Sequence, residues 1–144
     1  MIYNIMRTLL AETVRRNGEF VEAGYTSGYS DYAYNRELNT IALNAGRCIG
    51  HTSAIVKLVR WFLDEHPRNR VVIVDNEHER NFSRFAGEKR VFLVSEFGVM
   101  SDGLNAIGIN DFHLVFVEKA SYVDTLVVEH LWASYRPLRY ILLG

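Results

Sequence analysis

Apolar residues recur along this chain in two spacings, one typical of amphipathic helices and one of buried strands. Helical spacing or helix-forming composition predicts helices over 2–16, 52–66, 77–86 and 123–135. Continuous apolar runs predict strands over 40–44, 70–75, 90–94, 114–117 and 139–143. Because strands alternate with helices, we expect right-handed βαβ units. The fold class is therefore α/β, a three-layer α/β/α domain with a mainly parallel central sheet.

Two segments and one helix face complete this interpretation. Residues 19–36 are rich in Gly, Ser and Tyr and predict an ordered loop after a helix stop at Asn17-Gly18. Residues 97–110 predict a loop or short helix. The first loop contains four tyrosines, Tyr25, Tyr29, Tyr32 and Tyr34. These side chains either stack on a base or pack against the domain or a partner. The inner side of the helix over 123–135 is expected to carry Leu126, Val127, His130 and Leu131.

Length and composition indicate a single domain over 1–144, with a helix and Tyr-rich loop at 1–38 and a core at 39–144. Hydrophobic residues make up 49% and charged residues 23% of the 144, as in soluble globular proteins. The net charge of −1 gives no overall attraction to nucleic acid or membrane. Cys48 is the single cysteine, which favours a reducing compartment. Without a membrane-length apolar run or secretory leader, we expect a cytoplasmic location and no membrane partner.

The candidate chemistry begins with Ala45-Gly46-Arg47-Cys48-Ile49-Gly50-His51-Thr52. A strand, a glycine-bearing turn and a helix follow one another here, so backbone N–H groups would face a phosphate. Thr52 is placed to ligate Mg²⁺, whereas His51 stands where phosphate-binding loops have lysine. Imidazole is shorter than the lysine side chain and mostly neutral at neutral pH. The open alternative is a glycine turn before an ordinary helix.

A second candidate lies at the end of the run Leu114-Val115-Phe116-Val117, which Glu118-Lys119 follows. Lys119 is no general base when protonated. The alternative is a buried strand that ends in two solvated charges.

Together these motifs resemble the RecA-like P-loop NTPases, and more narrowly viral terminase ATPase domains and helicases. Their loop reads much like Gly-Arg-x-x-Gly-Lys-Thr, and their later strand is followed by Asp-Glu. The resemblance implies ATP and Mg²⁺ as cofactors, bound by residues 45–52, with Mg²⁺ held by Thr52 and Glu118. It implies that Arg47 acts as an arginine finger in cis, and that 139–144 is the next strand of the family. It also implies that Lys119 replaces the residue that activates water. We expect no second motor or nuclease domain.

Three hypotheses follow. The first is a degenerate, inactive NTPase-like protein that binds nucleotide weakly or not at all and acts on a protein partner or nucleic acid. Its source would be a phage, as an accessory or host-modulating protein in the host cytoplasm. The second is an active ATPase that uses His51, with a general base such as Glu96. The third is a plain interaction domain in a homodimer. A dinucleotide-binding fold around Asp75 is disfavoured because its glycine pattern is missing, and the histidines show no metal-ligand spacing.

Overall fold

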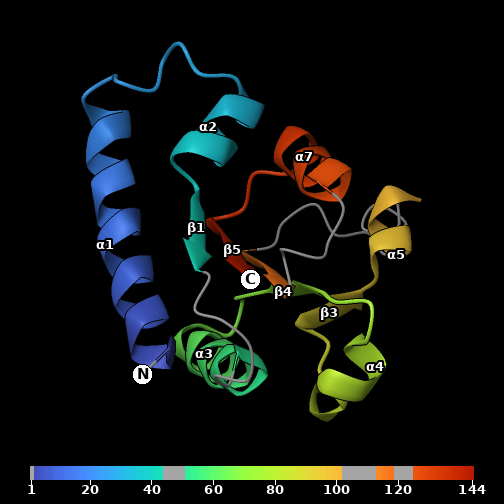
Figure 1. Cartoon of the computed structure of the whole chain (residues 1–144). Helices are drawn as coiled ribbons and strands as arrows, with labels where there is room; N and C mark the ends of the chain where they lie inside the picture. The colour runs from blue at the N-terminus through green and yellow to red at the C-terminus, as the bar shows by residue number, and fades with distance from the viewer. Residues whose placement is uncertain (1, 44–50, 102–112, 119–124) are drawn as a thin grey trace.

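The computed structural model of the chain describes residues 2–43, 51–101, 113–118 and 125–144. Its helical segments are α1 (Ile2–Glu22), α2 (Asp31–Glu37), α3 (His51–Glu65), α4 (His78–Asn81), η1 (Ser83–Phe85), α5 (Glu96–Met100) and α7 (Thr125–Ser134). Its strands are β1 (Thr40–Leu43), β2 (Val71–Val74), β3 (Val91–Val94), β4 (Leu114–Glu118) and β5 (Arg139–Leu143). Each strand lies within one residue of a predicted apolar run at either end (Figure 1).

The strands form one sheet in the order β1-β5-β4-β2-β3, and every pairing is parallel. Strand β4 occupies the middle, where Phe116 stands beside Ile141 of β5 and Ile73 of β2. All residues of β2 and β4 are buried. Burial on both faces explains why β2 and residues 114–117 of β4 are continuously apolar rather than alternating. The α/β class with a parallel sheet is confirmed.

Helices cover both faces of the sheet. The chain moves from β1 across to β2 and β3, and then back to β4 and β5. Because parallel crossovers are right-handed, connections that run in opposite directions lie on opposite faces. Accordingly α1, α3 and the α4–η1 segment share one hydrophobic cluster, while α5 and α7 share the other (Figure 1). Helix α2 packs beside α7.

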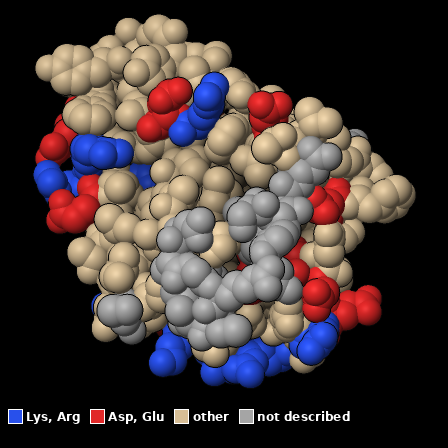
Figure 2. Space-filling model, in the orientation of Figure 1, with Lys and Arg blue, Asp and Glu red and all other residues tan. Residues whose placement is uncertain are grey.

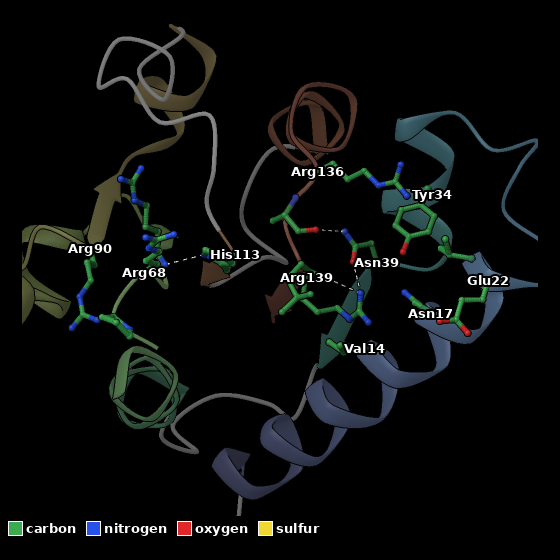
Figure 3. A pocket seen from close by; sticks show the side chains of 16 residues that line it. Val14, Asn17, Glu22, Tyr34, Asn39, Arg68, Arg90, His113, Arg136 and Arg139 are labelled. Atoms are coloured by element: carbon green, nitrogen blue, oxygen red, sulfur yellow. Dashed lines mark hydrogen bonds between the residues drawn. The ribbon is translucent and has the colours of Figure 1, made fainter. Parts of the chain in front are cut away.

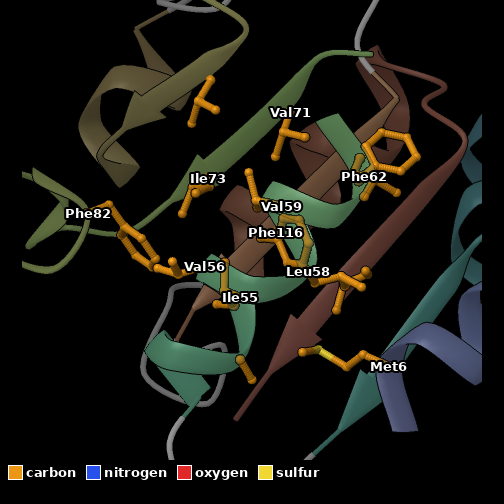
Figure 4. Close-up of a cluster of buried hydrophobic side chains, with 14 of the residues drawn as sticks. Met6, Ile55, Val56, Leu58, Val59, Phe62, Val71, Ile73, Phe82 and Phe116 are labelled. Carbon is orange, nitrogen blue, oxygen red and sulfur yellow. The ribbon is translucent and has the colours of Figure 1, made fainter. Parts of the chain in front are cut away.

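The larger hydrophobic cluster lies between α3 and the sheet (Figure 4). Ile55, Leu58 and Val59 project from α3 toward Phe116 and Ile73, and all five side chains have no exposed surface. Their spacing on α3 is the helical one read from the sequence. Burying such a side chain contributes roughly 1.5–3 kcal/mol relative to leaving it exposed. This packing fixes the start of α3 relative to the end of β4.

The expected helix stop at Asn17-Gly18 is wrong, because α1 continues to Glu22. Asn17 is buried, and its side-chain amide donates a 2.6 Å hydrogen bond to the carbonyl of Leu38. This tertiary contact offsets the helix cost of Gly18, about 1 kcal/mol relative to Ala. The helix ends near Gly24, whose φ of 78° is the left-handed conformation typical of helix ends.

The expected loop over 19–36 is also wrong in part, because it contains the end of α1 and most of α2. Ser30 caps α2 by accepting a hydrogen bond from the Ala33 N–H. Tyr34 is buried, whereas Tyr25 and Tyr29 are exposed. On α7, Leu126 was expected inside but is 59% exposed.

Tyr140→Phe should lower the free energy of unfolding. The Tyr140 hydroxyl is buried and lies 2.7 Å from the Leu131 carbonyl and 2.5 Å from the Tyr135 carbonyl, at the end of α7. Burial raises the pKa of this hydroxyl, so its proton stays available to donate. Losing the donor should cost about 1–2 kcal/mol. Urea unfolding measures the change, and Tyr25→Phe at an exposed tyrosine should change nothing. Equal stability of both variants would contradict the role given to this hydroxyl.

Candidate magnesium and phosphate site at the carboxyl edge

Strand periodicity directs Glu118 toward α3. Side chains two residues apart share one face of a strand. Leu114 and Phe116 both pack in the cluster that contains α3. Glu118, two residues further on, closes β4 at its carboxyl end and is only 4% exposed. A buried carboxylate is costly unless it is hydrogen-bonded or bound to a cation.

Thr52 supplies a hydrogen bond to that carboxylate. Thr52 is the second residue of α3, 66 residues before Glu118 in the chain. Its hydroxyl donates to Oε1 of Glu118 at 2.6 Å. This distance is typical of an O–H donor bonded to an ionised acceptor. The structure thus brings together the two residues for which the sequence predicts Mg²⁺ binding.

The topology makes this position a natural ligand site. Strands β1 and β4 flank β5, and the chain leaves β1 toward α3 but leaves β4 toward α7 on the opposite face. In open parallel sheets, ligands bind outside the carboxyl ends of the strands, where connections diverge in this way. The pair formed by Thr52 and Glu118 lies at that divergence, at the N-terminus of a 15-residue helix.

The chemistry available there suits a hard cation and an anion. A hydroxyl and a carboxylate are two oxygen ligands, and Mg²⁺ commonly takes one or two from protein and the rest from water and phosphate. The first N–H groups of a helix have no partner within the helix and favour a phosphate. Among the described residues, no group of three or more His, Cys, Asp or Glu side chains could hold a metal ion.

The remaining predicted site residues are only partly placed. His51 begins α3. The loop residues Ala45, Gly46, Arg47, Cys48, Ile49 and Gly50 lie outside the described residues, as does Lys119. The phosphate loop and the role of Arg47 therefore stay predictions.

Two other acidic residues are engaged in turns at the same sheet edge. Asp75 follows β2, where it is buried and accepts from the Glu77 N–H at 3.0 Å and the Asn81 amide at 2.8 Å. Glu96 begins α5 after β3 and accepts from the Asn76 amide at 2.5 Å. Asp75 therefore stabilises the turn into α4.

Sequence reasoning missed a set of polar side chains at the opposite, amino edge. Each strand is preceded or begun by one of them: Asn39, Arg70, Arg90, His113 and Arg139. In a parallel sheet the amino ends of all strands meet at one edge. A signal was therefore present, because a polar residue at every strand start predicts a polar edge.

No protein-family model and no curated protein matches this sequence. None of the helices in the described part of the chain is both long and apolar enough to span a bilayer.

Proposed function

We propose that this chain is a degenerate P-loop NTPase-like protein of RecA type. It binds a Mg²⁺–nucleotide weakly, does not hydrolyse it appreciably, and acts by contacting a partner. The observation that carries the proposal is the 2.6 Å hydrogen bond from the Thr52 hydroxyl to the Glu118 carboxylate. In P-loop NTPases a loop Ser or Thr and an acidic residue from a later strand hold Mg²⁺ between them.

Two sequence substitutions support weak binding without turnover. His51 stands where a lysine would contact the β- and γ-phosphates, and Lys119 stands where a second acid would position water. Mg²⁺ would neutralise phosphate charge beside Thr52 and Glu118. These residues hold the cation, but neither supplies the missing lysine contact. Loss at both positions favours a lost activity over an unusual active enzyme.

A protein partner fits the described surface better than nucleic acid does. On the face shown in Figure 2, Lys and Arg side chains gather mainly along the lower edge, and most of the described side chains in view are uncharged. A nucleic-acid backbone needs a continuous basic surface. Exposed aromatic side chains are typical of protein interfaces, and Tyr25 and Phe97 are 73% and 80% exposed. A second copy of this chain is one such partner, and a phage origin is consistent with the terminase likeness.

Thermal unfolding with Mg²⁺–ATP tests the nucleotide site. For a weak ligand at ten times its dissociation constant, stabilisation is about 1.4 kcal/mol, or a few degrees in melting temperature. Thr52→Ala and Glu118→Gln should abolish the Mg²⁺-dependent part of this shift. Thr52→Ser should keep it, because serine retains the hydroxyl.

Matched controls separate binding from general stability. Thr8→Ala and Glu65→Gln make the same chemical changes at exposed positions and should leave the shift unchanged. A shift that survives both Thr52→Ala and Glu118→Gln, or no shift in the native protein, would contradict the proposal. Phosphate release that depends on Glu118 would instead establish the active ATPase.

A further inference from the structure

A pocket of about 1230 Å³ opens at the amino edge of the sheet, where Figure 3 shows the side chains that line it. Thr52 and Glu118 lie at the opposite, carboxyl edge. The pocket lies between α1 on one side and the starts of β2 and β3 on the other. The acidic lining residue is Glu22. Five arginines line it: Arg68, Arg70, Arg90, Arg136 and Arg139. This excess of positive charge is local, because the whole chain has a net charge of −1.

Arg139 is the buried member of this set, only 2% exposed. Its Nε donates to the Thr13 hydroxyl at 2.9 Å, and its Nη1 donates to Asn39 Oδ1 and to the Leu138 carbonyl. Its Nη2 is buried with no hydrogen-bond partner among the described residues. An unsatisfied buried donor in a folded protein calls for an explanation, such as an absent ion or water.

The partners of Arg139 are all neutral. Thr13, Asn39 and a carbonyl orient the guanidinium, but no described carboxylate forms an ion pair with it. Burial lowers the pKa of Arg139 to about 10, and the charge of Arg16 acts in the same direction. Removing an unpaired charge from water is costly. An anion at this place would offset that cost.

Of the four other arginines that line the pocket, two form ion pairs with described carboxylates and two do not. Arg90 pairs with Glu88 at 3.3 Å, and Arg136 pairs with Asp31 at 3.1 Å. Arg68 and Arg70 form no ion pair with any carboxylate that the structure describes. The pocket therefore has a buried guanidinium at Arg139 and two available guanidinium groups at its exposed rim.

We propose that this amino-edge pocket binds a small soluble dianion, most simply a phosphate monoester. The phosphate group reaches Arg139, and Arg68 and Arg70 at the rim neutralise the charge of the phosphate oxygens that face outward. Guanidinium groups match the oxygens of phosphate and hold it through charge-assisted hydrogen bonds. A ligand with two negative charges suits a site with several cations better than a ligand with a single carboxylate does. The burial of Arg139 favours a terminal phosphate over a polymer backbone, which binds along exposed cations. This site is separate from the nucleotide site proposed above.

Titration of the full chain with inorganic phosphate tests the pocket. Chloride keeps the ionic strength constant, and amide resonances report where phosphate binds. Saturable shifts are expected at Asn39, Arg70 and His113. Arg139→Gln should weaken phosphate binding by about tenfold or more, because it removes a charge-assisted contact.

A second pair of variants covers the case in which Arg139→Gln does not fold. The double variant Arg68→Ala/Arg70→Ala changes exposed side chains and should weaken binding by roughly threefold to tenfold. Arg60→Ala/Arg84→Ala removes the same charge at exposed positions outside the pocket and should have no effect. Equal weakening by both double variants, or no saturable binding, would overturn the proposal.

Other probes distinguish the sources of the anion. Glycerol 3-phosphate should compete with inorganic phosphate, and a single-stranded oligonucleotide should not. Preferential binding of the oligonucleotide through Arg68 and Arg70 would replace the small-molecule proposal with a nucleic-acid one. Thr52→Ala should leave phosphate binding at this pocket unchanged. The two sites can therefore fail independently.

Discussion

Phe116→Ala is expected to lower the free energy of unfolding by about 3–5 kcal/mol. Phe116 lies in the middle of β4, the central strand, and has no exposed surface. Its ring packs beneath α3 near Ile55 and Val59 (Figure 4). Removing it deletes apolar contacts and leaves a cavity between a helix and a strand that are both held by other contacts. Since small domains are stable by about 5–15 kcal/mol, the loss is a large fraction of the total.

Phe97→Ala is the matched control, because it makes the same change where the ring is 80% exposed. We expect a change within about 0.5 kcal/mol. Urea unfolding followed by circular dichroism measures both variants. A loss for Phe97→Ala comparable to that for Phe116→Ala would contradict the exposure of Phe97 in the single chain. It would indicate that Phe97 is buried in an interface.

The strands were predictable because their signal is local and strong. The run Val71-Val72-Ile73-Val74 is apolar throughout, as a strand buried on both faces requires. The strand order was not predictable from these runs, because β2 and β4 are equally apolar and their pairing is long-range. Right-handed crossovers limit the possible orders but do not select one.

The wrong predictions near the N-terminus, a helix stop at Asn17-Gly18 and a loop over 19–36, have a different cause. Local propensity ends a helix at Asn17-Gly18, but the hydrogen bond from Asn17 to Leu38 joins residues 21 apart in the chain. Such a contact has no trace in local sequence spacing. Likewise Arg139 would be read as a solvated charge, because arginine is almost never fully buried unless paired.

The candidate site was predictable in one respect. The motif resemblance named Thr52 and Glu118 as residues that share a cation, and the fold places their oxygens 2.6 Å apart. The alternation of β4 and the position of α3 explain this proximity without reference to any family. The shape of the glycine loop before α3 stays a prediction.

Restoring the missing chemistry should increase nucleotide affinity. The double variant His51→Lys/Lys119→Glu should bind Mg²⁺–ATP about 10–100-fold more tightly than the native chain. This is the gain in affinity expected from one charge-assisted hydrogen bond to phosphate. The lysine would carry a full charge on a longer stem than imidazole. Glutamate at 119 would supply an acceptor for the attacking water, so measurable phosphate release is expected as well. Isothermal titration and a phosphate-release assay measure the two effects.

The single variants and charge controls decide which residue carries each effect. His51→Lys alone should give most of the gain in affinity, whereas Lys119→Glu alone should give little, because the glutamate acts on water rather than on nucleotide. His66→Lys and Lys89→Glu make the same changes at exposed positions and should alter affinity by less than about twofold. Adding Thr52→Ala to the restored chain should remove the dependence on Mg²⁺. If His51→Lys gains nothing while Thr52→Ala still lowers affinity, Thr52 and Glu118 bind a cation without a phosphate loop beside them.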